Sequence, residues 1–337
     1  MSQSFDIAVV GATGTVGETL VQVLEERNFP VGNLHLLASI ESAGHSVPFR
    51  GKNVRVLEVD AFDFSKVRLA FFAAGPAISR SYAEKAVAAG CSVVDLSGAF
   101  PAGQAANIVP EINAALLSAG GAGVHLVASP SAAATAVALV LAPLRAMLDL
   151  HSVSVTACLA VSALGREGVS ELARQTTELL NVRPLETSFF DRQMAFNVLA
   201  QVGTPDESGH LPLERRLVDE LRELLAQPSL KVSATCIQVP VFFGDSFTVA
   251  LRTTGPVDLA AVNAALEAAP GLELVDAGDY PTPVGDAVGQ DVVYVGRVRG
   301  GTDDPEQLNL WLTSDNVRKG AALNAVQVGE LLIKGYV

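Results

Sequence analysis

The sequence predicts an α/β protein in which a doubly wound unit precedes an α+β unit with a mixed sheet. Three observations support this prediction. Short apolar strands alternate with helical segments in the first part, and longer β-branched segments follow after about residue 150. The length of 337 residues suggests two domains, at roughly 150 residues per domain.

The first unit alternates buried strands with helices. Ile7–Val10 is an all-apolar run, as expected of a strand covered on both faces, and Glu18–Arg27 spaces its apolar residues at helical intervals. Further strands are expected at Leu34–Ala38, Val54–Val59, Leu69–Ala73 and Ser92–Asp95, with a helix at Ser81–Ala89. Strands that alternate with helices indicate a parallel sheet with right-handed crossovers.

The second unit has a different pattern, in which β-branched segments are separated by turn signals. Its strands are expected at Ser152–Val161, Lys231–Phe242 and Thr248–Thr253, and its helices at Ala132–Leu144, Val169–Leu180 and Leu213–Leu225. Ala132–Leu144 is shorter than the roughly 20 residues of a membrane span, so it predicts a buried helix. Leu213–Leu225 has the alternating charges of a solvated face, Gly203–Gly209 indicates a surface loop, and Asn316–Lys334 predicts a strong final helix.

Composition excludes several classes of protein. Lys and Arg number 23 against 36 Asp and Glu, a net charge of −13, which argues against nucleic acid as a partner. Apolar residues make up 49% and charged residues 18%, which is typical of a globular chain with a large core or a subunit interface. Met1–Ile7 lacks a basic segment, so no signal peptide is expected. The three widely spaced cysteines argue against a disulfide framework or a metal site and favour the cytoplasm.

A glycine-rich turn follows the first strand. Gly11, Gly14 and Gly17 are spaced GxxGxxG, one residue longer in the first gap than the Rossmann GxGxxG pattern. In a first strand-to-helix turn, such glycines let backbone N–H groups approach a pyrophosphate at the helix N-terminus. The turn therefore predicts dinucleotide binding, and the alternative is a turn that serves packing alone.

The cofactor ribose is usually contacted near the end of the second strand, where Glu41 is the only charged residue of Ala38–Gly44. A carboxylate accepts hydrogen bonds from a ribose diol and repels a 2′-phosphate. Glu41 thus favours NAD over NADP, or the absence of 2′-phosphate recognition. The alternative is a solvated loop glutamate.

Motifs along nearly the whole chain resemble the aspartate-semialdehyde dehydrogenase family. They are Val10–Gly17, Leu37–Gly44, Val94–Phe100, Val109–Asn113, Ala195–Asn197, Val239–Val241, Val295–Val298 and Asp315–Asn324. The resemblance implies a homodimer with a Rossmann-type nucleotide-binding domain at residues 1–130 and 316–337 and a dimerisation domain at 131–315. It also implies NAD or NADP as cofactor and no metal. The implied cofactor contacts are Gly11, Thr13, Gly14, Thr15, Val16, Ser39, Glu41, Ala74, Gly75, Ser162, Ala163 and Asn316.

The family reaction is reductive dephosphorylation of aspartyl phosphate with NADPH, through a thioester. This chemistry needs a thiolate, which is best placed at a helix N-terminus where the thiol pKa falls. It also needs a histidine acid/base, a glutamine that orients the acyl group, and arginines for the carboxylate and the phosphate.

The residues at these family positions do not supply that chemistry. The resemblance places Ala132 at the thiol, Leu159 at the glutamine, Asp245 at the histidine, Gln238 at the carboxylate-binding arginine and Pro101 at the phosphate-binding arginine. Alanine has no lone pair, and Asp245 would add negative charge beside an anionic substrate. We therefore assign no catalytic residue, and the pattern resembles the Usg-type branch of the family, which lacks the catalytic cysteine.

Other residues offer alternatives to the missing groups. Cys158 and Cys236 lie in expected strands and are interpreted as small buried hydrophobes. Ser131 precedes the Ala132 helix and is interpreted as a helix cap. The five histidines, His35, His45, His125, His151 and His210, fall outside the active-site motifs.

Glu214 and Arg216 lie near positions where the family contacts substrate. In one interpretation, these residues retain some affinity for an anion. In the other, which the charged sequence of the surrounding helix favours, they belong to a solvent-exposed helix face.

Three hypotheses follow. The favoured one is a non-catalytic homodimer that binds a dinucleotide, with a regulatory or scaffolding role through mixed dimers with an active paralogue. The second is an oxidoreductase that acts on another substrate by direct hydride transfer. The third is an active semialdehyde dehydrogenase with a nucleophile other than cysteine.

Overall fold

The chain divides into two compact units, Met1–Ser131 with Ala321–Val337, and Ala132–Gly320. The computed structural model describes residues 4–119, 123–201 and 203–334. Residues 1–3 and 335–337, which the resemblance assigns to the nucleotide domain, lie outside the described residues.

The first unit is built on one sheet with the strand order β3-β4-β2-β1-β5-β6-β8-β7. The strands are β1 (Phe5–Val10), β2 (Val31–Ala38), β3 (Ser46–Phe49), β4 (Lys52–Glu58), β5 (Leu69–Phe72), β6 (Ser92–Asp95), β7 (Ala106–Asn107) and β8 (Leu126–Ala128). All pairs are parallel except the β3–β4 hairpin, so the predicted parallel sheet is confirmed. The hairpin was not predicted, because β3 is short and contains Pro48, which is unfavourable within a strand.

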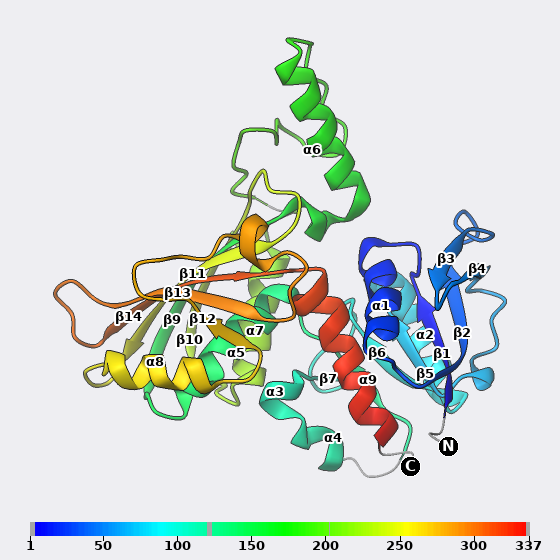
Figure 1. Cartoon of the computed structure of the whole chain (residues 1–337), viewed down its shortest axis with the longest axis horizontal. Helices are drawn as coiled ribbons and strands as arrows, with labels where there is room; N and C mark the ends of the chain where they lie inside the picture. Colours follow the sequence, from blue (N-terminus) through cyan, green and yellow to red (C-terminus); the bar gives the residue numbers. More distant parts are fainter. Residues whose placement is uncertain (1–3, 120–122, 202, 335–337) are drawn as a thin grey trace. The chain divides into compact units, whose positions relative to one another are not determined.

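Helices cover both faces of this sheet (Figure 1). They are α1 (Thr15–Glu26), η1 (Phe64–Lys66), α2 (Pro76–Ala88), α3 (Pro110–Asn113), α4 (Ala115–Ala119) and α9 (Asn324–Lys334). Side chains of α1 and α9 share one core with the sheet, and α2 packs in a separate core on the other face. α1 begins at Thr15 rather than Glu18. α2 begins at Pro76 rather than Ser81, because proline suits the first position of a helix.

The second unit is built on a sheet with the order β10-β9-β11-β14-β13-β12. The strands are β9 (Leu150–Leu159), β10 (Lys231–Gln238), β11 (Asp245–Thr253), β12 (Leu272–Leu274), β13 (Val293–Gly300) and β14 (Gln307–Ser314). β10 pairs with β9 and β12 pairs with β13 in parallel, and the other pairs are antiparallel. The predicted mixed sheet is therefore confirmed.

The helices of this unit are α5 (Ala132–Arg145), η2 (Val161–Leu164), α6 (Gly165–Leu180), α7 (Pro212–Leu224), α8 (Leu259–Ala268) and η3 (Pro283–Ala287). A further helical segment, η4 (Arg318–Leu323), begins in this unit and ends in the first. α5, α7 and α8 pack against the sheet, whereas α6 extends away from it (Figure 1). Every residue from Ala133 to Leu141 is buried, which confirms the predicted buried helix.

Several predicted boundaries in this unit are wrong. β10 ends at Gln238 rather than Phe242, because Pro240 has no N–H for the ladder, and β9 ends at Leu159 rather than Val161. The final helical segment begins at Arg318 rather than Asn316. The Asp315 carboxylate accepts hydrogen bonds from the N–H groups of Val317 and Arg318, and so caps the segment.

Candidate functional site

The glycine turn after β1 is tightly packed. Gly11 has a φ of 86°, and a Cβ there would lie 2.8 Å from the backbone of Ala73 and Ala74. A Cβ on Gly17 would lie 2.1 Å from the Gly11 carbonyl oxygen. Only glycine allows α1, β1 and the connection after β5 to approach this closely. Close packing therefore accounts for two of the three glycines.

Two helix N-termini lie at the carboxyl ends of adjacent strands in the first unit. Gly14 precedes α1 and Gly75 precedes α2, and neither helix has a side-chain hydrogen bond at its cap. A Cβ on Gly75 would meet open space. β1 and β5 are neighbours at the point where the strand order reverses, which is the usual ligand crevice of such sheets. The first-turn N–H groups of both helices can therefore hold an anion such as a pyrophosphate.

The other predicted contacts of this unit surround that crevice. Thr13, Thr15 and Val16 are half-buried in the turn and the start of α1. Ser39 and Glu41 are exposed in the turn that follows β2. Within this turn, the Ser39 carbonyl oxygen accepts hydrogen bonds from the N–H groups of Ser42 and Ala43. An exposed Glu41 is compatible with both interpretations of its role.

Three of the predicted cofactor contacts belong to the second unit. Asn316 Nδ2 donates a 3.0 Å hydrogen bond to Ser162 Oγ, and the Gly244 N–H donates one of 3.1 Å to Asn316 Oδ1. Ser162 and Asn316 are buried, and Ala163 follows Ser162 within η2. The fold thus brings Ser162 and Asn316 together.

The resemblance assigns the first residue of α5 to the thiol of the family chemistry. Ala132 stands there, half-buried, and presents only a methyl group. A Cβ on Gly320 would lie 2.5 Å from Ala132 Cβ, so the two backbones meet closely at this helix end. Ser131 is half-buried just before the helix.

Leu159 and Gln238 are paired at the ends of the parallel strands β9 and β10. Gln238 Nε2 donates a 2.8 Å hydrogen bond to the Leu159 carbonyl oxygen. Both side chains are buried, with exposed fractions of 2% for Leu159 and 1% for Gln238. The Gln238 amide is therefore engaged with the sheet backbone.

Asp245 begins β11 and is buried. Its Oδ1 accepts a 2.8 Å hydrogen bond from the Ala160 N–H. Burial, together with nearby Asp315, raises the pKa of Asp245 to about 7, although the Ala160 hydrogen bond favours the ionised form. The sequence predicts a fixed negative charge on Asp245. A carboxyl with a pKa of about 7 is instead partly protonated near neutral pH.

The thiols are poorly suited to nucleophilic attack. Burial raises the pKa of Cys91 and of Cys236 to about 12. Cys158 is half-buried rather than buried as predicted, because its side chain lies on the half-exposed side of β9, and burial and Asp245 raise its pKa. None of the three is ionised at neutral pH.

The predicted solvated face of α7 is wrong at Glu214. This side chain is buried; its Oε1 accepts a hydrogen bond from the Cys236 N–H and its Oε2 one from the Leu211 N–H, both 2.9 Å. Arg216 Nε donates to Glu220 Oε1 at 2.7 Å, and Glu220 is also buried. Glu214 turns inward because the backbone N–H groups of Leu211 and Cys236 need acceptors there, and Glu220 because it accepts from Arg216.

The other positions considered in the sequence are Pro101 and the histidines. Pro101 is exposed and uncharged in the loop after β6. His35 is half-buried in β2, and burial lowers its pKa. His151 Nε2 lies 3.4 Å from Lys231 Nζ.

Asp315 has an organising role that the sequence patterns did not predict. Besides capping η4, its carboxylate accepts a 2.8 Å hydrogen bond from the Gly289 N–H. An aspartate just before a helical segment was the available signal.

In the parts of the chain that the structure describes, no helix is both long and apolar enough to cross a bilayer. Across those same residues, metal-ligating side chains do not gather in groups of three or more.

Comparisons with known proteins match both units. Residues 141–319 match the family model described as semialdehyde dehydrogenase, dimerisation domain. Residues 6–119 match the model described as semialdehyde dehydrogenase, NAD binding domain.

Relatives are similar over the whole chain. A USG-1 protein homolog of Azotobacter vinelandii is 60% identical over 99% of each chain. Aspartate-semialdehyde dehydrogenase 2 of Vibrio cholerae is 41% identical over 100% of each chain. The structure of a probable aspartate-semialdehyde dehydrogenase from Pseudomonas aeruginosa has a TM-score of 0.97 and 58% identity, and the match covers 99% of this chain and 100% of that one.

Proposed function

Because this chain belongs to the aspartate-semialdehyde dehydrogenase family, we propose that it is a dinucleotide-binding homodimer without the family's reductive dephosphorylation activity. One observation carries the proposal. Ala132 presents a methyl group at the N-terminus of α5, where the family chemistry needs a thiolate. A thioester cannot form on this side chain.

The surrounding positions support the same conclusion. Leu159 is apolar, and Gln238 donates to the Leu159 carbonyl rather than presenting a cation. Asp245 is buried against the Ala160 N–H. Binding of a dianionic acyl phosphate needs fixed positive charge, which none of these residues provides.

The proposed cofactor is a nicotinamide dinucleotide, bound without a metal. Its pyrophosphate would lie over the uncapped N-termini after Gly14 and Gly75, and its ribose near Ser39 and Glu41. Bound nicotinamide would supply a hydride donor or acceptor. The exposed Glu41 favours NAD, because a carboxylate repels a 2′-phosphate.

We further propose that the two compact units are the nucleotide domain and the dimerisation domain. The match of residues 141–319 to a dimerisation model supports a homodimer. A mixed dimer with an active paralogue is the proposed route to a regulatory or scaffolding role. The three free cysteines suit the reducing cytoplasm that we propose as its location.

The direct test is phosphate-dependent reduction of NAD and NADP by the purified protein with aspartate semialdehyde. We expect no turnover above the buffer rate. Turnover that disappears in a Ser131→Ala variant would sink the proposal, because it would identify a substitute nucleophile. The combined variant Ala132→Cys, Gln238→Arg, Asp245→His tests whether the fold still positions the substrate. We expect it to recover phosphate-dependent reduction of NAD or NADP with aspartate semialdehyde.

A second candidate is oxidoreduction of another substrate by direct hydride transfer. The near-neutral pKa of Asp245 supports it, since general acid–base catalysis works best with a group that titrates near the operating pH. Reduction of carbonyl compounds by NADH that is lost in Asp245→Asn would establish this candidate. Equal rates in the two proteins would exclude Asp245 as its acid.

A further inference from the structure

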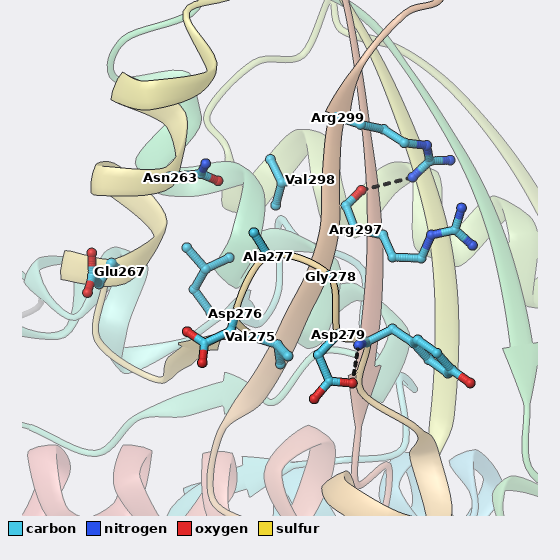
Figure 2. Close-up of a pocket in the computed structure, with 12 residues that line it drawn as sticks. Asn263, Glu267, Val275, Asp276, Ala277, Gly278, Asp279, Arg297, Val298 and Arg299 are labelled. Carbon is cyan, nitrogen blue, oxygen red and sulfur yellow. Dashed lines mark hydrogen bonds between the residues drawn. The ribbon is translucent and has the colours of Figure 1, made fainter.

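A cavity of about 550 Å³ lies beside β13 in the second unit, between α8 and the loop after β12. Figure 2 shows Arg297 and Arg299 extending from one side of the strand, with Asn263, Glu267 and Asp276 on the other side. Asp279, in the loop after β12, is a third acidic residue of the lining. Arg297 and Arg299 form a cationic wall, and Glu267 and Asp276 form an acidic wall. Its size is in the range of pockets that hold small molecules.

A β-bulge sets the position of the cationic wall. Gly296 pairs with Trp311 and Arg299 with Asn309, so β13 has one residue more than β14 between these pairs. An uninterrupted ladder would place Val298 opposite Asn309. Arg297, inside the bulge, has a φ of 51°, a left-handed conformation that is costly for residues other than glycine. Bulges recur beside functional sites because they redirect side chains.

The two guanidinium groups are not neutralised. Both side chains are exposed, and within the described chain neither has a carboxylate at ion-pair distance, although acidic residues line the same cavity. Arg299 Nη1 donates a 2.9 Å hydrogen bond to the Arg297 carbonyl oxygen, which ties the Arg299 side chain to the bulge. The remaining N–H groups suit a carboxylate, which a guanidinium binds through two parallel hydrogen bonds.

The loop that lines the cavity, residues 275–281, is held against the sheet by contacts at both of its ends. Trp311 Nε1 donates a 2.7 Å hydrogen bond to the Pro281 carbonyl oxygen. A Cβ on Gly296 would lie 2.5 Å from Pro281 Cδ, so loop and strand meet closely at that glycine. The Val275 N–H also donates to the Val295 carbonyl oxygen. Bonds at both ends of the loop hold the walls in place.

The acidic wall limits which ligands fit. Glu267 and Asp276 are exposed, and they would repel a ligand that carries only negative charge. An ammonium group would be attracted to them. The two walls together select a molecule with charges of opposite sign at its two ends.

We propose that this cavity binds a small zwitterion, with its carboxylate on Arg297 and Arg299 and its ammonium group near Asp276 and Glu267. Because the walls lie on opposite sides of β13, the two charges of the ligand must be several bonds apart (Figure 2). The residues of this cavity belong to the second unit and the glycine turn belongs to the first, so the proposal goes beyond dinucleotide binding.

Calorimetry at low ionic strength tests the proposal with ω-amino carboxylates of increasing length: glycine, β-alanine, γ-aminobutyrate and ε-aminocaproate. We expect a preferred length at γ-aminobutyrate or longer, with affinity about tenfold above that of acetate or propylammonium. Arg297→Gln combined with Arg299→Gln should abolish this preference, and Glu267→Gln combined with Asp276→Asn should reduce every member to the affinity of acetate.

Arg55→Gln is the matched control, because Arg55 is an exposed arginine in the other unit. It should leave the affinities unchanged. The proposal is overturned if no member binds more tightly than acetate, or if the double arginine variant binds as the wild type does. A change of oligomer mass in light scattering for that variant, without a change in zwitterion affinity, would instead assign the arginines to a subunit interface.

Discussion

The carboxylate of Asp245 accepts a 2.8 Å hydrogen bond from the backbone N–H of Ala160, across the β9–β11 pair. The carboxyl is buried, so its ionisation is coupled to folding. This relationship links the carboxyl of Asp245 to the stability of the second unit.

Stability should therefore depend on pH through Asp245. Its pKa is raised from 3.8 to about 7, so the folded protein holds a proton that the unfolded chain releases. The stabilisation is complete below pH 3.8 and is lost as pH rises through about 7. Compared with Asp245→Asn, wild-type unfolding free energy in urea should fall by up to about 4 kcal/mol over this range. Parallel pH profiles for the two proteins would contradict the assignment.

A thiol introduced at the start of α5 should be reactive. The positive end of a helix dipole lowers a thiol pKa, so Ala132→Cys should react with iodoacetamide at pH 7 about tenfold faster than a buried cysteine. Mass spectrometry of the modified peptides provides the rates. Ala136→Cys is the control, since residue 136 lies within the buried part of the same helix. Equal rates in the two variants would show that Ala132 is not at an activating helix end.

Glu214 should be structural. Glu214→Ala removes the acceptors of two backbone N–H groups, those of Leu211 and Cys236, and should cost about 2–4 kcal/mol of unfolding free energy. Asp219→Ala on the exposed side of the same helix should change it by less than about 0.5 kcal/mol. Denaturant titration measures both values. Similar small losses in the two variants would restore the interpretation of a solvated face.

Cofactor preference should follow the charge at residue 41. We expect the wild type to bind NAD more tightly than NADP in calorimetry, and Glu41→Arg to reverse the order by about tenfold in affinity ratio. Glu84→Arg, an exposed glutamate on α2, makes the same change of charge and should keep the wild-type order. Tighter NADP binding by the wild type would refute the charge argument.

Local patterns were sufficient to predict much of the fold. The apolar run before Gly11 and the glycine spacing predicted β1, its turn and α1, because strands and turns of this kind depend on neighbouring residues. The buried helix at α5 followed from an apolar stretch too short for a bilayer. Helix starts were less accurate, because the proline at the start of α2 and the cap at Asp315 act at the ends of the pattern.

The sequence by itself determined the resemblance to the family, from which Ala132 is assigned to the thiol position, and the order of strands and helices that defines the two units. Only the tertiary structure decided that Glu214 is buried on the N–H groups of Leu211 and Cys236, and that Asp245 bonds Ala160. It also decided that a bulge places Arg297 and Arg299 along one cavity. The reason is physical: the charge state and exposure of a polar group depend on partners that folding brings from distant parts of the chain.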